Sequence, residues 1–398
     1  MDANDPSPLT LAADVALRSR ESAGLLRKRL AWRPTGPVTV ERDGREYVNF
    51  ASNNYLGLTH HPRLLTALHR AANVGSGAAG LISGHTDAHA RAEAVIAAWK
   101  GYDAAILLPS GYQANLAVVQ TLAAIHADGG GVRFLIDKLA HASLLDAVRT
   151  AGLAFRIFPH NGLTKLARLL ADAPPGQTQV VLTESIFSMD GDAADLAGLA
   201  ELRRRHPFVL VVDEAHGSGV YGRHGAGLVD ELNLRAAVDV TVVTLSKALG
   251  LAGAAVCGPP SFVSATENFG RAYIYSTAVP PLTAELAAEA VAVCHDEPQH
   301  RDRVRAVAAR VRASLHSRGL AVPAGDSPII PISLGDPATA LAAAERLRDA
   351  GLLVVAVRPP TVPPGTSRLR VTVSAAHSDE QIERLLEALP RVLSSAAS

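Results

Sequence analysis

The sequence contains few cysteines, few aromatic residues and no excess of either charge. Its two cysteines, Cys257 and Cys294, are too few for a disulfide framework or a cysteine zinc cage. The 38 Lys and Arg residues balance 38 Asp and Glu residues, so the composition gives no reason to expect nucleic acid or an anionic membrane as a partner. These features argue against a disulfide-rich secreted protein and favour a reduced, intracellular setting.

Long hydrophobic runs are also missing. No charge-free stretch reaches the length of a bilayer span, and the first residues lack an apolar core of signal-peptide length. We therefore expect a soluble cytoplasmic protein. Hydrophobic residues make up 48% and charged residues 19% of the 398 residues, so the chain can bury a large core and extensive disorder is not expected.

Apolar runs of strand length alternate with Ala- and Leu-rich helical segments in the middle of the chain. Continuous apolar runs are typical of strands that are buried on both faces of a mainly parallel sheet, with helices as right-handed crossovers. We therefore expect an α/β protein in which residues 46–281 form a large domain. The preceding residues 1–45 look like an arm with a basic helix. Residues 282–398 indicate a smaller α+β domain. It begins with a long Ala-rich helix, and then come the run PIIPISL, a helix over ATALAAAERLRDAG, a strand over LLVVAV, a strand over RLRVTVS and a closing helix.

Polar or titratable residues follow five of the apolar runs. Ligands of open α/β sheets bind outside the carboxyl ends of the strands, so five such endings together predict a site. The runs are 104–108, 134–136, 180–183, 208–212 and 240–245, and the residues that follow them include Ser110, Gly111, Tyr112, Asp137, His141, Glu184, Asp213, His216, Ser246 and Lys247.

Two of these signals also have purely structural interpretations. In the motif DEAHG, Asp213 could cap a helix beside a surface histidine, and Lys247 could be a lysine whose stem lies along apolar surface. No metal is predicted, because neither His-Glu-x-x-His nor paired-cysteine spacing occurs. A nucleotide phosphate loop of the Gly-x-x-x-x-Gly-Lys-Ser/Thr type is likewise missing.

Lys247 and Asp213 together fit the chemistry of pyridoxal 5'-phosphate (PLP). A lysine among apolar neighbours has a lowered pKa and can form an imine. A carboxylate such as Asp213 can keep the pyridine nitrogen protonated, so that the ring accepts electrons. Gly111 and Tyr112 open a helix that Ser110 can cap, and the start of a helix binds a phosphate.

Further residues can complete a PLP site. His141 could cover the face of the ring, and His216 could reach its phenolic oxygen. Thr244 could donate a hydroxyl to the phosphate.

The motifs in this order resemble the α-oxoamine synthases, which are PLP enzymes of the aspartate-aminotransferase fold type I. The similarity covers nearly the whole chain and is carried by SNNYLGL, GSGAAGLISG, SGYQAN, HASLLDA, TESIFSMDGD, DEAHGSGV, TLSKALG, YIYSTAVPP and RPPTVPPGTSRLRVT. The resemblance implies a large, mainly parallel-sheet PLP domain, a smaller α+β C-terminal domain and a homodimer with sites at the subunit interface.

The resemblance also implies a role for each matching position in the cofactor site. Lys247 would form the imine, and Asp213 and His216 would contact the ring nitrogen and the phenolic oxygen. His141 would stack on the ring and help to place the substrate. The other cofactor positions would be Gly111, Tyr112, Glu184, Ser188, Thr244 and, reaching the phosphate of the second subunit, Thr277.

The resemblance places the substrate residues in the arm and the C-terminal domain. Arg370 would clamp the carboxylate of the amino acid by bidentate pairing. Arg358 and Thr361 would line the path of the acyl substrate, and Arg27 would face the acyl-CoA.

Within the family, the chain is most similar to the acyltransferases that condense L-alanine with pimeloyl-CoA, or a pimeloyl carrier protein, in biotin synthesis. Three alternatives remain open from the sequence. One is a synthase that joins glycine to acetyl-CoA or succinyl-CoA. The second is an aminotransferase of the same fold, and the third is a binding protein that has kept the fold without catalysis.

Overall fold

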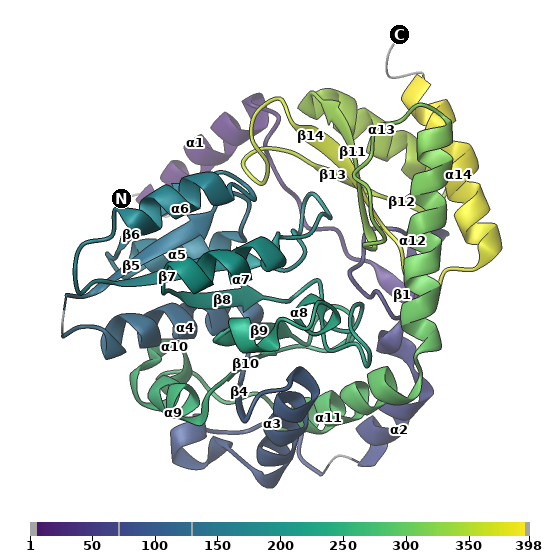
Figure 1. Ribbon diagram of the computed structural model, residues 1–398. Helices are drawn as coiled ribbons and strands as arrows, with labels where there is room; N and C mark the ends of the chain where they lie inside the picture. The colour runs from purple at the N-terminus through teal and green to yellow at the C-terminus, as the bar shows by residue number, and fades with distance from the viewer. Residues whose placement is uncertain (1–5, 71, 129, 395–398) are drawn as a thin grey trace.

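The computed structural model describes residues 6–70, 72–128 and 130–394, and a seven-stranded sheet lies at its centre (Figure 1). The strand order is β4-β10-β9-β8-β7-β5-β6, and β10 runs in the opposite direction to the other six strands. The strands are β4 Ala104–Leu108, β5 Val132–Asp137, β6 Ala154–Phe158, β7 Thr178–Glu184, β8 Val209–Asp213, β9 Val240–Thr244 and β10 Ala254–Gly258. All five apolar runs overlap strands of this sheet, which confirms the predicted α/β class.

The strands read as continuous apolar runs because helices cover both faces of the sheet. Successive side chains of a strand point to opposite faces, so Phe134 and Leu135 belong to different buried clusters. The first face packs against α4 Gly111–Ile125, α5 Ala142–Thr150, α9 Pro260–Phe269 and α10 Arg271–Ile274. The second packs against α3 Asp87–Lys100, α6 Leu163–Ala171, α7 Leu196–Arg205 and α11 Pro281–Asp296.

The C-terminal part of the chain forms a separate antiparallel sheet in the order β11-β14-β13. Its elements are β11 Ile329–Gly335, β13 Val355–Val357, β14 Ser367–Thr372, α12 Gln299–Ser317, α13 Pro337–Asp349 and α14 Asp379–Ser394. The long Ala-rich helix expected from residue 282 is wrong as a single element. It divides into α11 and α12 around Pro298, since a proline lacks the N–H that a helix interior requires.

A third sheet joins the two ends of the sequence. It has the order β1-β2-β3-β12, and β12 pairs with β3 in parallel. The strands are β1 Arg33–Gly36, β2 Thr39–Arg42, β3 Arg45–Asn49 and β12 Leu352–Leu353. The run LLVVAV, expected as one strand, therefore serves two sheets as β12 and β13. The expected arm contains α1 Pro8–Ser22 followed by β1 and β2, and the domain limits stay a prediction.

The remaining helical elements are short and connect these layers. They are α2 Pro62–Arg70, α8 Leu228–Glu231, two 3-10 turns at Leu58–His60 and Arg235–Ala237, and a π-helical turn at Gly80–Gly84. Across the described part of the chain, no helix combines the length and apolar character that a membrane crossing would need.

A buried ion pair holds the loop that follows β8. Lys100, at the end of α3, donates to the Glu214 carboxylate at 2.5 Å and also to the carbonyl oxygen of Ala226. The second carboxylate oxygen of Glu214 accepts from the Val229 amide at 3.0 Å. Because Glu214 directly follows Asp213, this ion pair fixes the backbone at the end of β8, where the Asp213 carboxylate lies.

We expect Lys100→Met to lower the free energy of unfolding by about 3–5 kcal/mol, because it leaves the Glu214 carboxylate buried without its counter-ion. Urea unfolding followed by circular dichroism measures this change. Lys165→Met, at an exposed position of α6, is the matched control and should have little effect. Equal losses in the two variants would contradict the structural role of the ion pair.

Candidate active site

A cavity of about 160 Å³ opens at the carboxyl ends of β4, β5, β7, β8 and β9. It is lined by Gly111, Tyr112, Asn115, His141, Ser143, Glu184, Asp213, Ala215, Thr244, Ser246 and Lys247. The structure thus brings together residues from all five predicted strand endings. Most of the predicted cofactor positions are among them, although they are scattered over more than 130 residues of sequence.

Lys247 supplies an amine whose protonation is finely balanced. Burial lowers the pKa of Lys247 to a net value of about 8, with the charges of Asp213 and Glu184 opposing the shift and the charge of Arg370 supporting it. Its Nζ lies 2.8 Å from Nε2 of His216. An amine with this pKa is partly neutral near neutral pH, so it can act as a nucleophile or as a base.

His216 links this amine to a buried chain of hydrogen bonds. Burial and the neighbouring cations, with Lys247 first among them, lower the pKa of His216 well below its ordinary value, so the imidazole is neutral. Its Nδ1 lies 2.5 Å from the hydroxyl of Tyr55, and burial raises the pKa of Tyr55 to about 12. That hydroxyl also donates to Oδ1 of Asn53 at 3.1 Å, which accepts from Arg370 Nη1 at 3.0 Å. The chain therefore connects Lys247 with Arg370.

Asp213 is held in place by two donors. Its Oδ2 accepts from Nδ2 of Asn115 at 2.9 Å, and its Oδ1 accepts from the Ala215 amide at 2.9 Å. The Asn115 amide also donates to the hydroxyl of Ser143 at 2.8 Å. This arrangement fixes the orientation of a buried carboxylate in the cavity wall, as recognition of a cationic ring nitrogen requires.

Glu184 and His141 complete the polar lining. Burial, followed by the charge of Asp213, raises the pKa of Glu184 well above its ordinary value. Its Oε1 is buried without a hydrogen-bond partner among the described residues. Desolvation lowers the pKa of His141, and its Nδ1 accepts from the Ser143 amide at the start of α5. The imidazole of His141 therefore lies in the cavity in its neutral form.

The start of α4 forms the anion-binding end of the cavity. The Ser110 hydroxyl caps the helix by accepting from the Gln113 amide at 3.2 Å, as predicted. The free N–H groups and the dipole of this helix favour an anion there. The hydroxyls of Thr244 and Ser246, 2.9 Å apart, lie in the same lining.

The donor set fits PLP. It combines a partly neutral lysine amine, an oriented carboxylate and a helix start with hydroxyls for a phosphate. It also includes a buried carboxyl oxygen that has no hydrogen-bond partner among the residues that the structure describes.

A second cavity of about 480 Å³ contains the predicted substrate residues. Arg27 donates to the Thr361 hydroxyl at 3.0 Å, and Arg358 donates to the backbone carbonyls of Gly24 and Leu26. The arm is thereby fastened to the loop that precedes β14. The lining is Arg27, Lys28, Ala51, Met189, Val355, Ala356, Val357, Arg358, Thr361 and Arg370.

Arg370 is anchored on one side and open on the other. Its Nε donates to the Ser188 carbonyl at 2.7 Å, and its Nη1 donates to Asn53 and Thr372, each at 3.0 Å. These hydrogen bonds use Nε and Nη1, and the guanidinium lines the second cavity. The guanidinium can therefore bind a carboxylate without giving up its anchors.

Three predicted residues lie outside the lining of both cavities. His216 lies behind Lys247, and Ser188 contributes its backbone carbonyl to Arg370. Thr277 is exposed and forms an isolated bridge with Ala79. Another cavity, of about 650 Å³ and lined in part by α3 and α11, contains none of the predicted site residues.

Sequence reasoning missed four polar residues that the geometry places at the site. Asn53 and Tyr55 belong to the motif SNNYLGL, and Asn115 belongs to SGYQAN, so the motifs contained the signal although no role was assigned to these residues. Ser143 follows His141 in HASLLDA and had no separate signal.

Comparisons with known proteins agree with this geometry. The family model described as aminotransferase class I and II matches residues 45–389 of the chain. The chain is 42% identical to 8-amino-7-oxononanoate synthase of Thioalkalivibrio sulfidiphilus, over 94% of this chain and 95% of that protein. It is 43% identical to the synthase of Cronobacter sakazakii, over 94% of this chain and 97% of that protein.

Solved structures show the same fold. A serine palmitoyltransferase of Sphingomonas wittichii superposes with a TM-score of 0.90 at 28% identity, covering 98% of this chain and 99% of that one. A variant of the S. paucimobilis enzyme, with PLP and myriocin bound, gives 0.90 at 25% identity, covering 98% and 100%. The 8-amino-7-oxononanoate synthase of Francisella tularensis gives 0.74 at 26% identity, covering 88% and 99%.

In each comparison with a synthase, the sequence similarity covers almost the full length of this chain and of the synthase. Together with the matching family model, it shows that the chain belongs to the class I and II aminotransferases and, within them, to the 8-amino-7-oxononanoate synthases.

Proposed function

We propose that the chain uses PLP to condense L-alanine with a pimeloyl thioester, carried by CoA or a carrier protein, to form 8-amino-7-oxononanoate. The observation that carries this proposal is the pair of neighbouring cavities. One holds the amine of Lys247, the other is cationic with apolar walls, and Arg370 lines the second while its hydrogen-bond chain reaches Lys247.

The residues of the smaller cavity would hold PLP. Asp213 would pair with the ring nitrogen, His141 would cover the ring and His216 would face the phenolic oxygen. The start of α4, at Gly111 and Tyr112, would bind the phosphate together with the hydroxyl of Thr244. Bound PLP supplies an electron sink that stabilises negative charge at the Cα atom of the amino acid.

The protein groups then position alanine and move its proton. The guanidinium of Arg370 binds the alanine carboxylate, which directs the Cα–H bond toward the amine of Lys247. Neutral Lys247 takes the Cα proton, and its lowered pKa keeps part of the population in that base form. The hydrogen bond between the amine and Nε2 of His216, whose ring is itself fixed by Tyr55, holds the amine in position.

The second cavity suits the acyl donor. Val355, Val357 and Met189 offer apolar surface to a chain of methylene groups, and the nearby cations attract its carboxylate or the phosphates of CoA. A carbon–carbon bond forms between Cα of alanine and the thioester carbonyl carbon, and the thiol leaves. Carbon dioxide is then lost from the former alanine carboxylate, and a proton returns to Cα from Lys247.

A homodimer is part of this proposal. Exposed apolar side chains surround the segment that contains Thr277, with Val74 82% exposed, Ile82 80% and Tyr275 73%. A second subunit would cover this surface and would receive Thr277 near its own phosphate site. A reducing compartment such as the cytoplasm is the proposed location, supported by the two buried free thiols of Cys257 and Cys294.

The substrate assignment is tested by measuring release of the free thiol with defined substrate pairs. We expect turnover with L-alanine and pimeloyl-CoA or pimeloyl carrier protein, together with a product of the mass of 8-amino-7-oxononanoate. Glycine with acetyl-CoA or succinyl-CoA should give at most a small fraction of that rate. Faster turnover with glycine would replace this substrate assignment, and formation of the amine form of the cofactor from alanine alone would indicate an aminotransferase.

Lys247→Ala should reduce turnover at least ~100-fold, because it removes the base, and should abolish the visible absorption of the cofactor bound through this amine. Lys138→Ala, at an exposed position after β5, is the control and should behave like the unchanged protein. The assignment of Lys247 fails if the variant keeps both the absorption and the turnover.

Arg370→Lys should raise the KM for L-alanine about 10- to 100-fold, because a lysine cannot pair with a carboxylate in a bidentate manner. Steady-state kinetics at saturating thioester measure this change, and Arg205→Lys at an exposed position is the control. An unchanged KM for alanine with a raised KM for the thioester would move Arg370 to the acyl site.

A further inference from the structure

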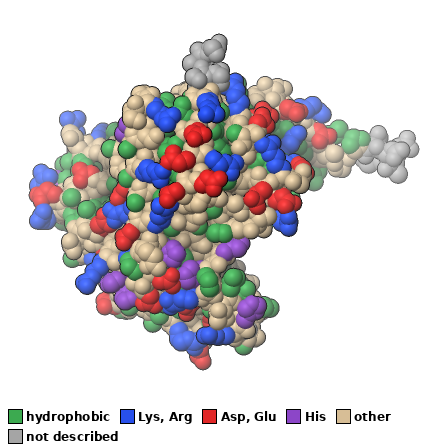
Figure 2. All heavy atoms as spheres, turned by 90° about the vertical axis from the view of Figure 1, so that its right-hand side faces the viewer, with side chains coloured by type: hydrophobic (Ala, Val, Ile, Leu, Met, Phe, Trp, Pro, Cys, Tyr) green, Lys and Arg blue, Asp and Glu red, His purple; other side chains and the backbone are tan. Residues whose placement is uncertain are grey.

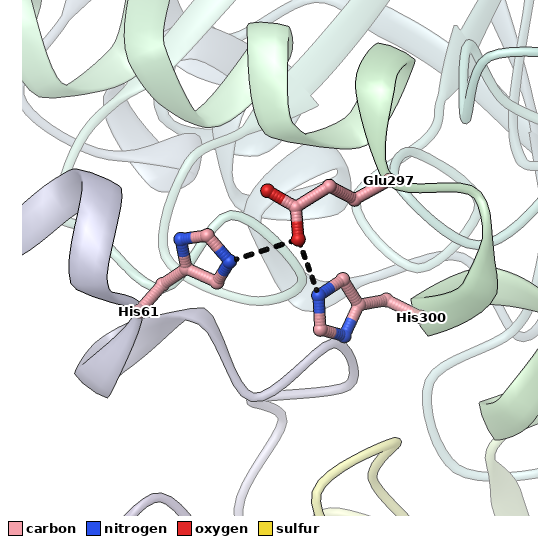
Figure 3. Close-up of side chains that lie close together, drawn as sticks. All are labelled: His61, Glu297 and His300. Carbon is pink, nitrogen blue, oxygen red and sulfur yellow. Dashed lines mark hydrogen bonds and ion pairs between the residues drawn. The ribbon is translucent and has the colours of Figure 1, made fainter.

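Two histidines and a glutamate meet on the surface where α2 and the junction of α11 with α12 come together. Figure 2 shows histidine side chains gathered on the lower half of this side of the molecule. His61 directly precedes α2, Glu297 follows α11, and His300 lies in the first turn of α12. Figure 3 shows both imidazole rings directed toward one carboxylate oxygen of Glu297. All three side chains are half-buried, and one ligand atom from each lies within 4.8 Å of the others.

The distances in this cluster suit a small cation better than two direct hydrogen bonds. Oε2 of Glu297 lies 3.2 Å from Nε2 of His61 and 3.3 Å from Nε2 of His300. Charge-assisted hydrogen bonds between such groups are usually shorter, at about 2.7–2.9 Å. Ligand atoms at about 2.05 Å from a tetrahedral zinc ion are separated by roughly 3.3 Å. The two oxygen–nitrogen separations are therefore close to this spacing, and the two imidazole nitrogens lie within 4.8 Å of each other.

An arginine and two further carboxylates surround the glutamate. Arg63 lies 3.6 Å from the other oxygen, Oε1, which leaves Oε2 directed toward the histidines. The charge of Arg63 is offset by Glu289 at 2.6 Å and Asp296 at 3.0 Å.

We propose that His61, Glu297 and His300 form a binding site for a divalent transition-metal cation, with zinc as the favoured ion. Two imidazole nitrogens and one carboxylate oxygen are a ligand set that suits zinc, whereas magnesium and calcium prefer all-oxygen sites. Water would fill the fourth position, because the half-exposed cluster is open to solvent. Two of the three ligands, Glu297 and His300, are only three residues apart in the sequence. His61 is brought next to them by the fold.

The position of the site indicates a structural role. His61 belongs to the segment before α2, which packs against α11, whereas α12 runs along the C-terminal sheet (Figure 1). A bound cation would tie these two parts together at the turn around Pro298. The site shares no residue with either of the two cavities described above, so this proposal does not depend on the proposed function.

The test uses the PLP-loaded protein without a histidine tag, freed of metal with a chelator and titrated with zinc chloride by calorimetry. We expect one zinc ion per chain, and His300→Ala should raise the Kd at least tenfold. His69→Ala, which removes an exposed histidine of α2, is the matched control and should leave the Kd unchanged. Zinc should also raise the melting temperature of the unchanged protein and of the control, but not that of His300→Ala.

A conservative variant and a spectroscopic measurement distinguish loss of the metal site from loss of folding. Glu297→Gln keeps the size of the side chain and should weaken zinc binding as His300→Ala does. Cobalt(II) at this site should give the intense visible absorption of four-coordinate cobalt, and both variants should lose it. The proposal is overturned if zinc binds with the same Kd to the unchanged protein and to folded His300→Ala or Glu297→Gln, or if no zinc binds.

Discussion

Burial removes water from the amine of Lys247, while Asp213 and Glu184 act to restore its charge. The balance between these effects depends on positions that only the assembled sheet provides, because the three residues come from the ends of β7, β8 and β9. Parallel strands place their carboxyl ends at one edge, so this arrangement follows from the topology rather than from any local motif. The ion pair between Lys100 and Glu214 then keeps the end of β8 in register with the cavity.

The central sheet and the main cavity could be predicted because their signals are local. An apolar run followed by Asp213 or Lys247 is visible in the sequence. In an open α/β fold, the residues that follow such strands lie at the carboxyl edge of the sheet, where ligands bind. The roles of Tyr55 and Asn115 could not be predicted in the same way. Their hydrogen bonds join residues 161 and 98 positions apart, and nothing in the local pattern names the partner. The cluster of His61, Glu297 and His300 has no sequence pattern for the same reason, since His61 and Glu297 meet only in space.

The errors in the C-terminal part have a physical cause as well. The run LLVVAV contains no glycine, proline or polar residue that would mark a break between strands, yet Leu352 pairs with β3 and Val355 pairs with β14. Strand propensity depends on the partners that are available, so one apolar run can serve two sheets. The Ala-rich helix was extended too far because alanine favours helix on both sides of Pro298, and composition alone does not show where the axis turns.

The parallel pairing of β3 with β12 has a consequence for synthesis on the ribosome. Val48 and Leu352 are neighbours in the sheet, although about 300 residues separate them in the chain. The strand β3 can pair with β12 only after most of the polypeptide has left the ribosome. Closing so long a loop is entropically costly. The hairpin of β2 and β3 can form at once, but it leaves an unsatisfied backbone edge during translation. Such an edge can pair with other chains or with chaperones until β12 has been synthesised.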